Sequence, residues 1–90
     1  MEKTIITVVG HDTVGIIARI CTYLAQNRIN ILDISQTITG GYFNMMMVTD
    51  TSASEKNTGQ IADDLDEIGA QMNLSIRCMQ ADIFSAMHRI

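Results

Sequence analysis

The segment from residue 8 to residue 17, VVGHDTVGII, gathers residue types that can hold a small charged ligand. An apolar run stops at Gly10, a short polar turn follows, and a second apolar run starts after Gly15. Glycine frees the backbone for a turn, and Asp12 or Thr13 is expected to cap the amides that open a following helix. Amides at a helix start carry partial positive charge, so the segment predicts a cradle for an anionic group.

Two interpretations of this turn stay open at the level of the residues. Gly10, Asp12 and Gly15 also suit an ordinary strand-to-helix connection that binds nothing. Gly15 costs up to about 1 kcal/mol of helix propensity relative to alanine, which indicates close approach by a strand, a partner chain or a ligand. His11 could donate to a carboxylate and respond to pH near neutrality, or it could be a surface or structural residue.

Length and charge limit the kind of protein that carries this turn. Ninety residues make one domain, long enough to bury roughly 60–70% of its unfolded surface. The formal net charge is −4 and the six basic residues are scattered, which argues against direct binding to nucleic acid. The sequence has neither a secretory signal nor an apolar run near the roughly 18 residues that span a bilayer. We therefore expect a cytoplasmic protein with no membrane contact.

The sulfur-containing residues do not predict a metal site. Cys21 and Cys78 are isolated among apolar residues, without zinc-type spacing, and are expected to be reduced core residues. Met45, Met46 and Met47 are consecutive, and neighbouring strand residues point to opposite faces, so the three cannot converge on one ion. We predict no metal and no cofactor, and expect methionines on the sheet face away from the helices to fill gaps beneath a C-terminal helix.

The rest of the chain predicts six regular elements and a helical tail. Apolar β-branched or alternating residues predict four strands. Apolar residues three and four apart predict two amphipathic helices, the second opened by a capping box of Asn57 and Gln60. A short final helix is expected to be capped by Asp82. The strands are residues 3–9, 31–39, 42–50 and 74–81, and the helices are residues 13–27, 57–72 and 82–90. The apolar face of the tail comprises Ile83, Phe84, Met87 and Ile90.

The order β-α-β-β-α-β, with a hairpin at Gly40 and Gly41, predicts an α+β ferredoxin-like sandwich. A four-stranded antiparallel sheet would carry the first two helices on one face. Right-handed crossovers place the first and third strands in the centre and the second strand at an edge. Because no linker interrupts the chain, residues 1–90 are expected to form a single domain, with residues 82–90 as a helical extension.

Three features of this sequence together resemble one known family. They are the βαββαβ order, the segment GHDTVGII at residues 10–17 before the first helix, and NILDI at residues 30–34 opening the second strand. This combination resembles an ACT domain over nearly the whole chain. In length the chain is similar to the small stand-alone ACT proteins of bacteria and archaea. The resemblance implies a regulatory module rather than an enzyme.

The resemblance also implies where a partner and a ligand would lie. ACT domains typically pair side by side through the sheet edge that carries the second strand, and small ligands, often amino acids, bind where the first loop faces the partner. The implied cradle comprises Gly10, His11, Asp12, Thr13, Val14, Gly15 and Ile16. The implied opposing wall comprises Asn30, Ile31, Leu32 and Asp33. The expected protein is thus a homodimer that senses an amino acid and acts on a separate protein in trans.

This chain departs from the family pattern within the first loop. Thr13 and Val14 stand where the family often has a basic residue and a proline, which changes the charge and the rigidity of the loop. The ligand expected from the residues themselves is a small zwitterion, with its carboxylate on the helix-start amides and its ammonium group on Asp12, Asp33 or backbone carbonyls.

Other proteins of the same sandwich architecture need residues that this sequence lacks. An acylphosphatase-like enzyme needs an arginine in the first loop, and a metallochaperone needs Cys-x-x-Cys there. An RNA-recognition sandwich needs exposed aromatic residues with basic neighbours. The first loop offers His11 as its single potential cation. The remaining alternative is a protein-interaction module that pairs through the same edge and binds no small ligand.

Overall fold

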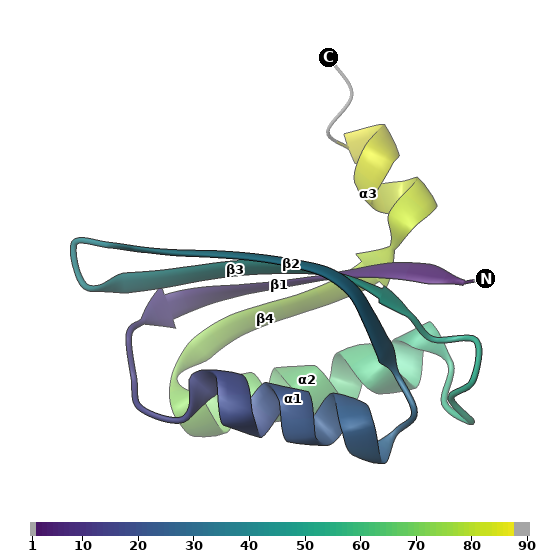
Figure 1. Ribbon diagram of the computed structural model, residues 1–90, viewed down its shortest axis with the longest axis horizontal. Coiled ribbons are helices and arrows are strands. Elements are labelled where there is room, and N and C mark those ends of the chain that lie inside the picture. Colours follow the sequence, from purple (N-terminus) through teal and green to yellow (C-terminus); the bar gives the residue numbers. More distant parts are fainter. Residues whose placement is uncertain (1, 88–90) are drawn as a thin grey trace.

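The computed structural model describes residues 2–87, in which four strands and three helices form an α/β sandwich (Figure 1). In chain order the elements are β1 (Lys3–His11), α1 (Ile16–Gln26), β2 (Asn30–Thr39), β3 (Tyr42–Asp50), α2 (Thr58–Met72), β4 (Leu74–Gln80) and α3 (Ala81–Met87). Every strand pair is antiparallel, and the strand order is β2-β3-β1-β4. This confirms the predicted ferredoxin-like fold, with β1 and β3 in the centre and β2 at an edge.

The core lies between the sheet and the two long helices, which cover the same face (Figure 1). Alternate residues of the central strands point toward the helices, as the two-residue period of a strand requires. Apolar residues three and four apart on each helix point back at them. The residues buried at the centre of this core include Ile6, Val8, Ile20, Leu24, Phe43, Met47, Ile61 and Leu65.

Local signals predicted the start of α2 and the hairpin correctly. The Asn57 side chain accepts from the Gln60 amide, and the Gln60 side chain accepts from the Asn57 amide, both at 2.9 Å. Gly40 and Gly41 both have positive φ, at 59° and 81°, which joins β2 to β3 by a tight turn. These turns are specified by a few adjacent residues, so the sequence alone could reveal them.

The three consecutive methionines of β3 lie on alternate faces of the sheet. Met45 and Met47 are buried against the helices, and Met46, 41% exposed, faces the opposite side of the sheet. The three side chains thus alternate between the two faces of the sheet, as predicted, and Met46 is the one on the face away from α1 and α2. Both faces of β3 read as apolar in the sequence, and only the register shows which face meets the helices.

The C-terminal helix also differs from its prediction. α3 begins at Ala81, so Asp82 lies inside its first turn instead of capping it. In Figure 1, α3 rises from the end of β4 on the side of the sheet opposite α1 and α2, and it contacts β1 and β4. Ile83 is exposed, so the predicted apolar face is only partly covered. The predicted contribution of Ile90 lies outside the described residues.

Cys21 and Cys78 are both free and half-buried. Cys78 packs against the core, as predicted. Burial raises the pKa of the Cys78 thiol to about 11, so this thiol stays protonated at neutral pH. Cys78 is consequently an inert packing residue rather than a nucleophile.

At Gly69 the helix α2 lies close to β4, and replacing this glycine with alanine tests that packing. A Cβ at Gly69 would lie 2.6 Å from the Leu74 carbonyl oxygen. Gly69→Ala should destabilise the domain by about 1–3 kcal/mol, the typical cost of overpacking, although alanine by itself favours a helix. Urea denaturation followed by circular dichroism measures this cost.

Gly59→Ala in the same helix is the matched control, because its Cβ would meet only the Asn57 side-chain oxygen, at 3.3 Å. Its effect should be much smaller. Equal stabilities for the two variants would contradict the close crossing of α2 over β4.

Candidate functional site

The loop between β1 and α1 turns into the helix through its backbone rather than through a side-chain cap. α1 begins at Ile16, and Gly15 is its N-cap residue, with a left-handed φ of 91°. The Thr13 hydroxyl donates to the carbonyl oxygen of His11 at 3.2 Å, away from the helix. The predicted cap by Asp12 or Thr13 and the predicted helix start at residue 13 are therefore wrong. The chain enters the helix at the left-handed Gly15, which follows both Asp12 and Thr13 in the sequence.

This arrangement leaves the start of α1 open to a ligand. Across the described part of the chain, no side chain caps α1 and no acidic residue lies in its first turn. Uncapped helix-start amides favour an anion. A Cβ on Gly15 would meet no atom within 4 Å, and Val14 is 98% exposed. The Asp12 amide donates to the Gly41 carbonyl oxygen at 2.9 Å, which ties this open loop to the β2–β3 hairpin.

Two of the predicted cradle residues belong to β1 instead of the loop. His11 lies on the face opposite the buried Val8, and its ring stacks on Tyr42 with 4.7 Å between the ring centroids. Gly10 allows close packing, because a Cβ there would lie 2.6 Å from the Leu74 side chain. The structure thus brings together Asp12, Thr13, Val14, Gly15 and Ile16. It places the His11 side chain on the face of the sheet that points away from α1 and α2.

The predicted opposing wall lies at the far end of the sheet from this loop. The pairing register defines two end rows, each crossing β2, β3 and β1. One row is Asn30, Asp50 and Lys3, and the other is Thr39, Tyr42 and His11. Eight or nine residues at about 3.3 Å each separate the rows by roughly 25–30 Å. Within one chain, the loop after β1 and the start of β2 therefore cannot contact the same small molecule.

The wall itself is shaped by a bulge in β2. The pairing register shifts between Ile31 and Asp33, so Leu32 is an extra residue on the edge strand. Ile31 packs against the core. The Asp33 carboxylate accepts from the Ile34 amide at 2.8 Å, which orients this exposed acid. The sequence predicted a regular strand here, because a bulge depends on the partner strand.

The outer edge of β2 carries exposed apolar side chains. Ile34 and Ile38 pair with the buried Met47 and Phe43, so they lie on the helix side of the sheet. They are nevertheless 43% and 57% exposed. Leu32 is exposed too, and β2 pairs only with β3. An apolar edge strand with free backbone groups is a template for pairing with another chain.

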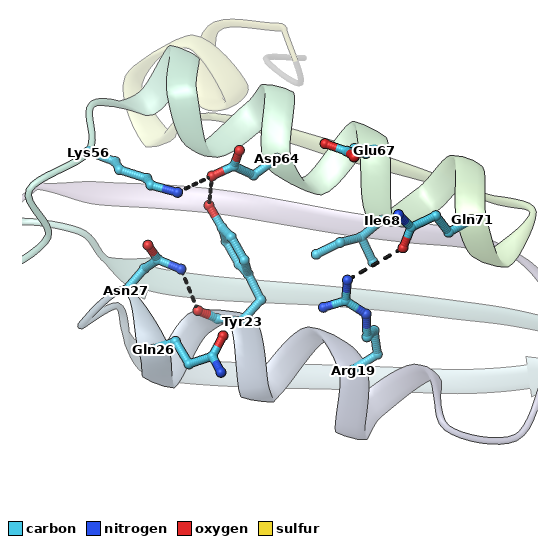
Figure 2. A pocket seen from close by; sticks show the side chains of 9 residues that line it. All are labelled: Arg19, Tyr23, Gln26, Asn27, Lys56, Asp64, Glu67, Ile68 and Gln71. Atoms are coloured by element: carbon cyan, nitrogen blue, oxygen red, sulfur yellow. Dashed lines mark hydrogen bonds and ion pairs between the residues drawn. The ribbon is translucent and has the colours of Figure 1, made fainter.

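A second group of functional side chains, which the sequence analysis missed, lies between α1 and α2 (Figure 2). The Tyr23 phenol donates to Asp64 Oδ2 at 2.6 Å, and Lys56 pairs with the same oxygen. The Lys56 ammonium group also lies 5.6 Å from the centroid of the Tyr23 ring. The position of Tyr23 in the apolar stripe of α1 was a signal of burial, but its partners come from a distant loop and helix.

The electrostatics of this group follow from these contacts. Hydrogen bonds from Lys56 and then Tyr23 hold the pKa of Asp64 below its usual range. Burial, followed by the hydrogen bond to Asp64, raises the pKa of the Tyr23 phenol. At neutral pH the group therefore consists of a neutral phenol and a neutralising pair of opposite charges.

The described residues 2–87 hold no cluster of three or more histidine, cysteine or acidic side chains that could bind a metal ion. Over the same residues, no helix is both long and apolar enough to cross a membrane.

The fold and the open helix start define a small ferredoxin-like module. The family model for the ACT domain matches residues 2–79, so the chain belongs to the ACT-domain family. A UPF0237 protein of Bifidobacterium longum is 56% identical over 90 residues, which is all of both chains. A UPF0237 protein of Clostridium acetobutylicum is 48% identical over 88 residues, covering 98% of this chain and 99% of that protein.

Solved structures agree with this assignment. An ACT domain protein from Streptococcus pneumoniae has a TM-score of 0.81 at 37% identity, covering 97% of this chain and 98% of that one. A putative glycine cleavage system transcriptional repressor has a TM-score of 0.75 at 23% identity, covering 89% of this chain and 46% of its own. At that identity the likeness shows the fold alone. ACT domains are regulatory modules that bind small ligands and commonly dimerise, and the three more similar proteins named here carry no enzyme name.

Replacing Asp64 with asparagine should flatten the acid side of the stability profile. The folded-state pKa of Asp64 is lowered, first by Lys56 and then by Tyr23. Its stabilising contribution is therefore complete above the unfolded-state pKa of about 3.9 and is lost as the pH falls through the folded-state value. Urea denaturation at a series of pH values from about 2 to 6 measures the slope.

Asp66→Asn, at an exposed position on the same helix, controls for the loss of one carboxylate. It should leave the slope nearly unchanged. If Asp64→Asn has the slope of the parent chain, the Tyr23–Asp64–Lys56 group does not contribute to folding in the way described.

Proposed function

We propose that this chain is a homodimeric regulatory module that binds a free amino acid between the β1–α1 loop of one protomer and the start of β2 of its partner. It acts on a separate protein in trans. The observation that carries the proposal is the separation of the two half-sites by roughly 25–30 Å within one chain.

Antiparallel pairing of β2 with β2 of a second copy would bring the half-sites together. The end of β2 lies in the same row as the end of β1, next to the loop. A two-fold axis through the middle of β2 places the start of the partner's strand at that end. The interface is isologous, so each dimer has two equivalent sites.

The apolar side chains of the edge support this pairing. Leu32, Ile34 and Ile38 line β2, and Ile17 is exposed on the neighbouring helix α1. Covering these residues removes apolar surface from water and pairs the free edge of the sheet. The dimer is therefore expected to depend on hydrogen bonds of the β2 backbone and on apolar side-chain contacts on the helix side of β2.

The charges of the two half-sites suit a zwitterion. The open amides at Gly15 and Ile16 face the α-carboxylate, and the left-handed glycine keeps a side chain out of its way. Asp12 on the loop and Asp33 on the partner's strand supply carboxylates for the ammonium group. His11 contributes indirectly, because its stacking on Tyr42 fixes the end of the strand that leads into the loop.

A protein-interaction module without a small ligand is the second candidate. It is favoured by the same exposed edge, since Leu32, Ile34 and Ile38 would drive pairing whether or not a ligand binds. The two candidates share a dimer and differ in what the β1–α1 loop does.

Thermal shift and isothermal titration against the twenty amino acids, with the dimer measured by analytical ultracentrifugation, separate the candidates. At tenfold excess over its Kd, a ligand should raise Tm by on the order of 5 °C. Gly15→Leu should abolish this shift and leave dimers intact, because the side chain fills the space at the helix start and leucine disfavours the left-handed φ of 91° found there. Asp33→Asn should weaken binding, whereas Asp66→Asn on the exposed side of α2 should not.

A charge on the edge tests the shared site. Ile38→Lys should weaken the dimer and the amino-acid response together. If the unsubstituted chain forms dimers and no amino acid raises its Tm, the interaction module is correct. If monomers of the Ile38→Lys variant bind an amino acid at the β1–α1 loop as tightly as the unsubstituted chain does, the proposal of a site shared between two protomers is wrong.

A further inference from the structure

A groove lies between α1 and α2, and none of the residues that line it belongs to the β1–α1 loop or to β2. It is an open groove on the surface, with a mostly polar lining and a volume of about 460 Å³. The buried Ile68 and Tyr23 contribute apolar surface between the two helices, as Figure 2 shows. Polar side chains from α1 and α2 line its sides, among them Arg19, Glu67 and Gln71.

Two of the four charges in the groove are already neutralised. Lys56 pairs with Asp64, which also accepts the Tyr23 hydrogen bond. Arg19 and Glu67 remain, one on each helix.

These two opposite charges do not meet. Within residues 2–87 the ion pair is Lys56–Asp64, and Arg19 and Glu67 are not within pairing distance of any opposite charge. The Arg19 guanidinium donates only a long hydrogen bond, 3.4 Å, to the uncharged amide oxygen of Gln71. A separated cation and anion facing one groove have the charge pattern that complements a molecule with both signs.

We propose that this groove binds a small zwitterion, with its carboxylate on Arg19 and its ammonium group on Glu67. The planar guanidinium has several donors in a fixed geometry and suits a carboxylate, which is a better acceptor than the Gln71 amide. The short aliphatic part of the ligand lies over Ile68 beside the Tyr23 ring. The bound zwitterion adds a bridge between α1 and α2 to the two that the free protein has, Tyr23–Asp64 and the weaker Arg19–Gln71.

The site is independent of the proposed amino-acid site in position and composition. Its lining residues come from α1, α2 and the segments that precede α2 and follow α1, with none from the β1–α1 loop. It needs no second copy, because both charges belong to one chain. The Arg19 amide donates to the Gly15 carbonyl oxygen at 2.9 Å, so Arg19 lies one helical turn after the β1–α1 loop.

Nuclear magnetic resonance of the ¹⁵N-labelled chain, titrated with each of the twenty amino acids, locates binding residue by residue. We expect saturable shifts at Arg19, Tyr23, Glu67 and Gln71 for at least one of them. Shifts confined to residues 12–16 and 30–33 would overturn the groove site and leave the proposed function standing. Shifts confined to the groove would support it and count against the interface site. No saturable shift in the groove up to about 10 mM overturns the proposal, since weaker binding amounts to less than about 3 kcal/mol.

Charge exchange tests the assignment of the two ends. Arg19→Glu and Glu67→Arg should each lower the affinity by about tenfold or more, because each leaves two like charges facing the ligand. The double variant Arg19→Glu/Glu67→Arg should recover binding, since a zwitterion can bind in the reverse direction. Asp66→Arg makes the same change of charge on α2 outside the groove and should bind normally. Failure of the double variant, with its spectrum well dispersed, overturns the assignment.

Derivatives with a single charge test the class of ligand. The N-acetyl and the amide forms of the tightest-binding amino acid each remove one charge and should bind about tenfold more weakly. If the N-acetyl form binds as tightly as the parent, the groove is an anion site and the zwitterion proposal is wrong.

Discussion

The antiparallel pairing of β1 with β3 is the constraint on which the rest of this structure depends. It makes the chain cross the full length of the sheet in each strand, so the loop after β1 and the start of β2 lie at opposite ends. The helix α1, with the segments before and after it, connects these two ends. A site that uses both ends must therefore be completed by a second chain, and the free edge of β2 lies where that chain would pair.

The same topology brings the two helices α1 and α2 into contact with each other. α1 and α2 cover one face of the sheet and are joined by side chains: Tyr23 to Asp64, and Arg19 to Gln71. The two possible ligand sites differ in what holds them. The proposed loop site would use backbone amides and depend on association, whereas the proposed groove site would use side-chain charges of one folded chain.

Features specified by adjacent residues could be predicted from the sequence, and those specified by distant partners could not. The capping box at Asn57 and the hairpin at Gly40 were predicted correctly, because each turn depends on its own residues. The start of α1 was wrong by three residues, since Gly15 takes a left-handed conformation that glycine allows but does not require. The bulge at Leu32 and the groove around Tyr23 depend on strands and helices far along the chain, which a single sequence does not place together.

Amide hydrogen exchange at increasing protein concentration tests the central claim most directly. The β2 amides that point away from β3 should exchange quickly in the monomer and become protected as the chain dimerises. The free edge of β4, which pairs only with β1, serves as an internal reference and should not change with concentration. If the outward amides of β2 exchange quickly at every concentration while the chain associates, the half-sites are not joined through this edge.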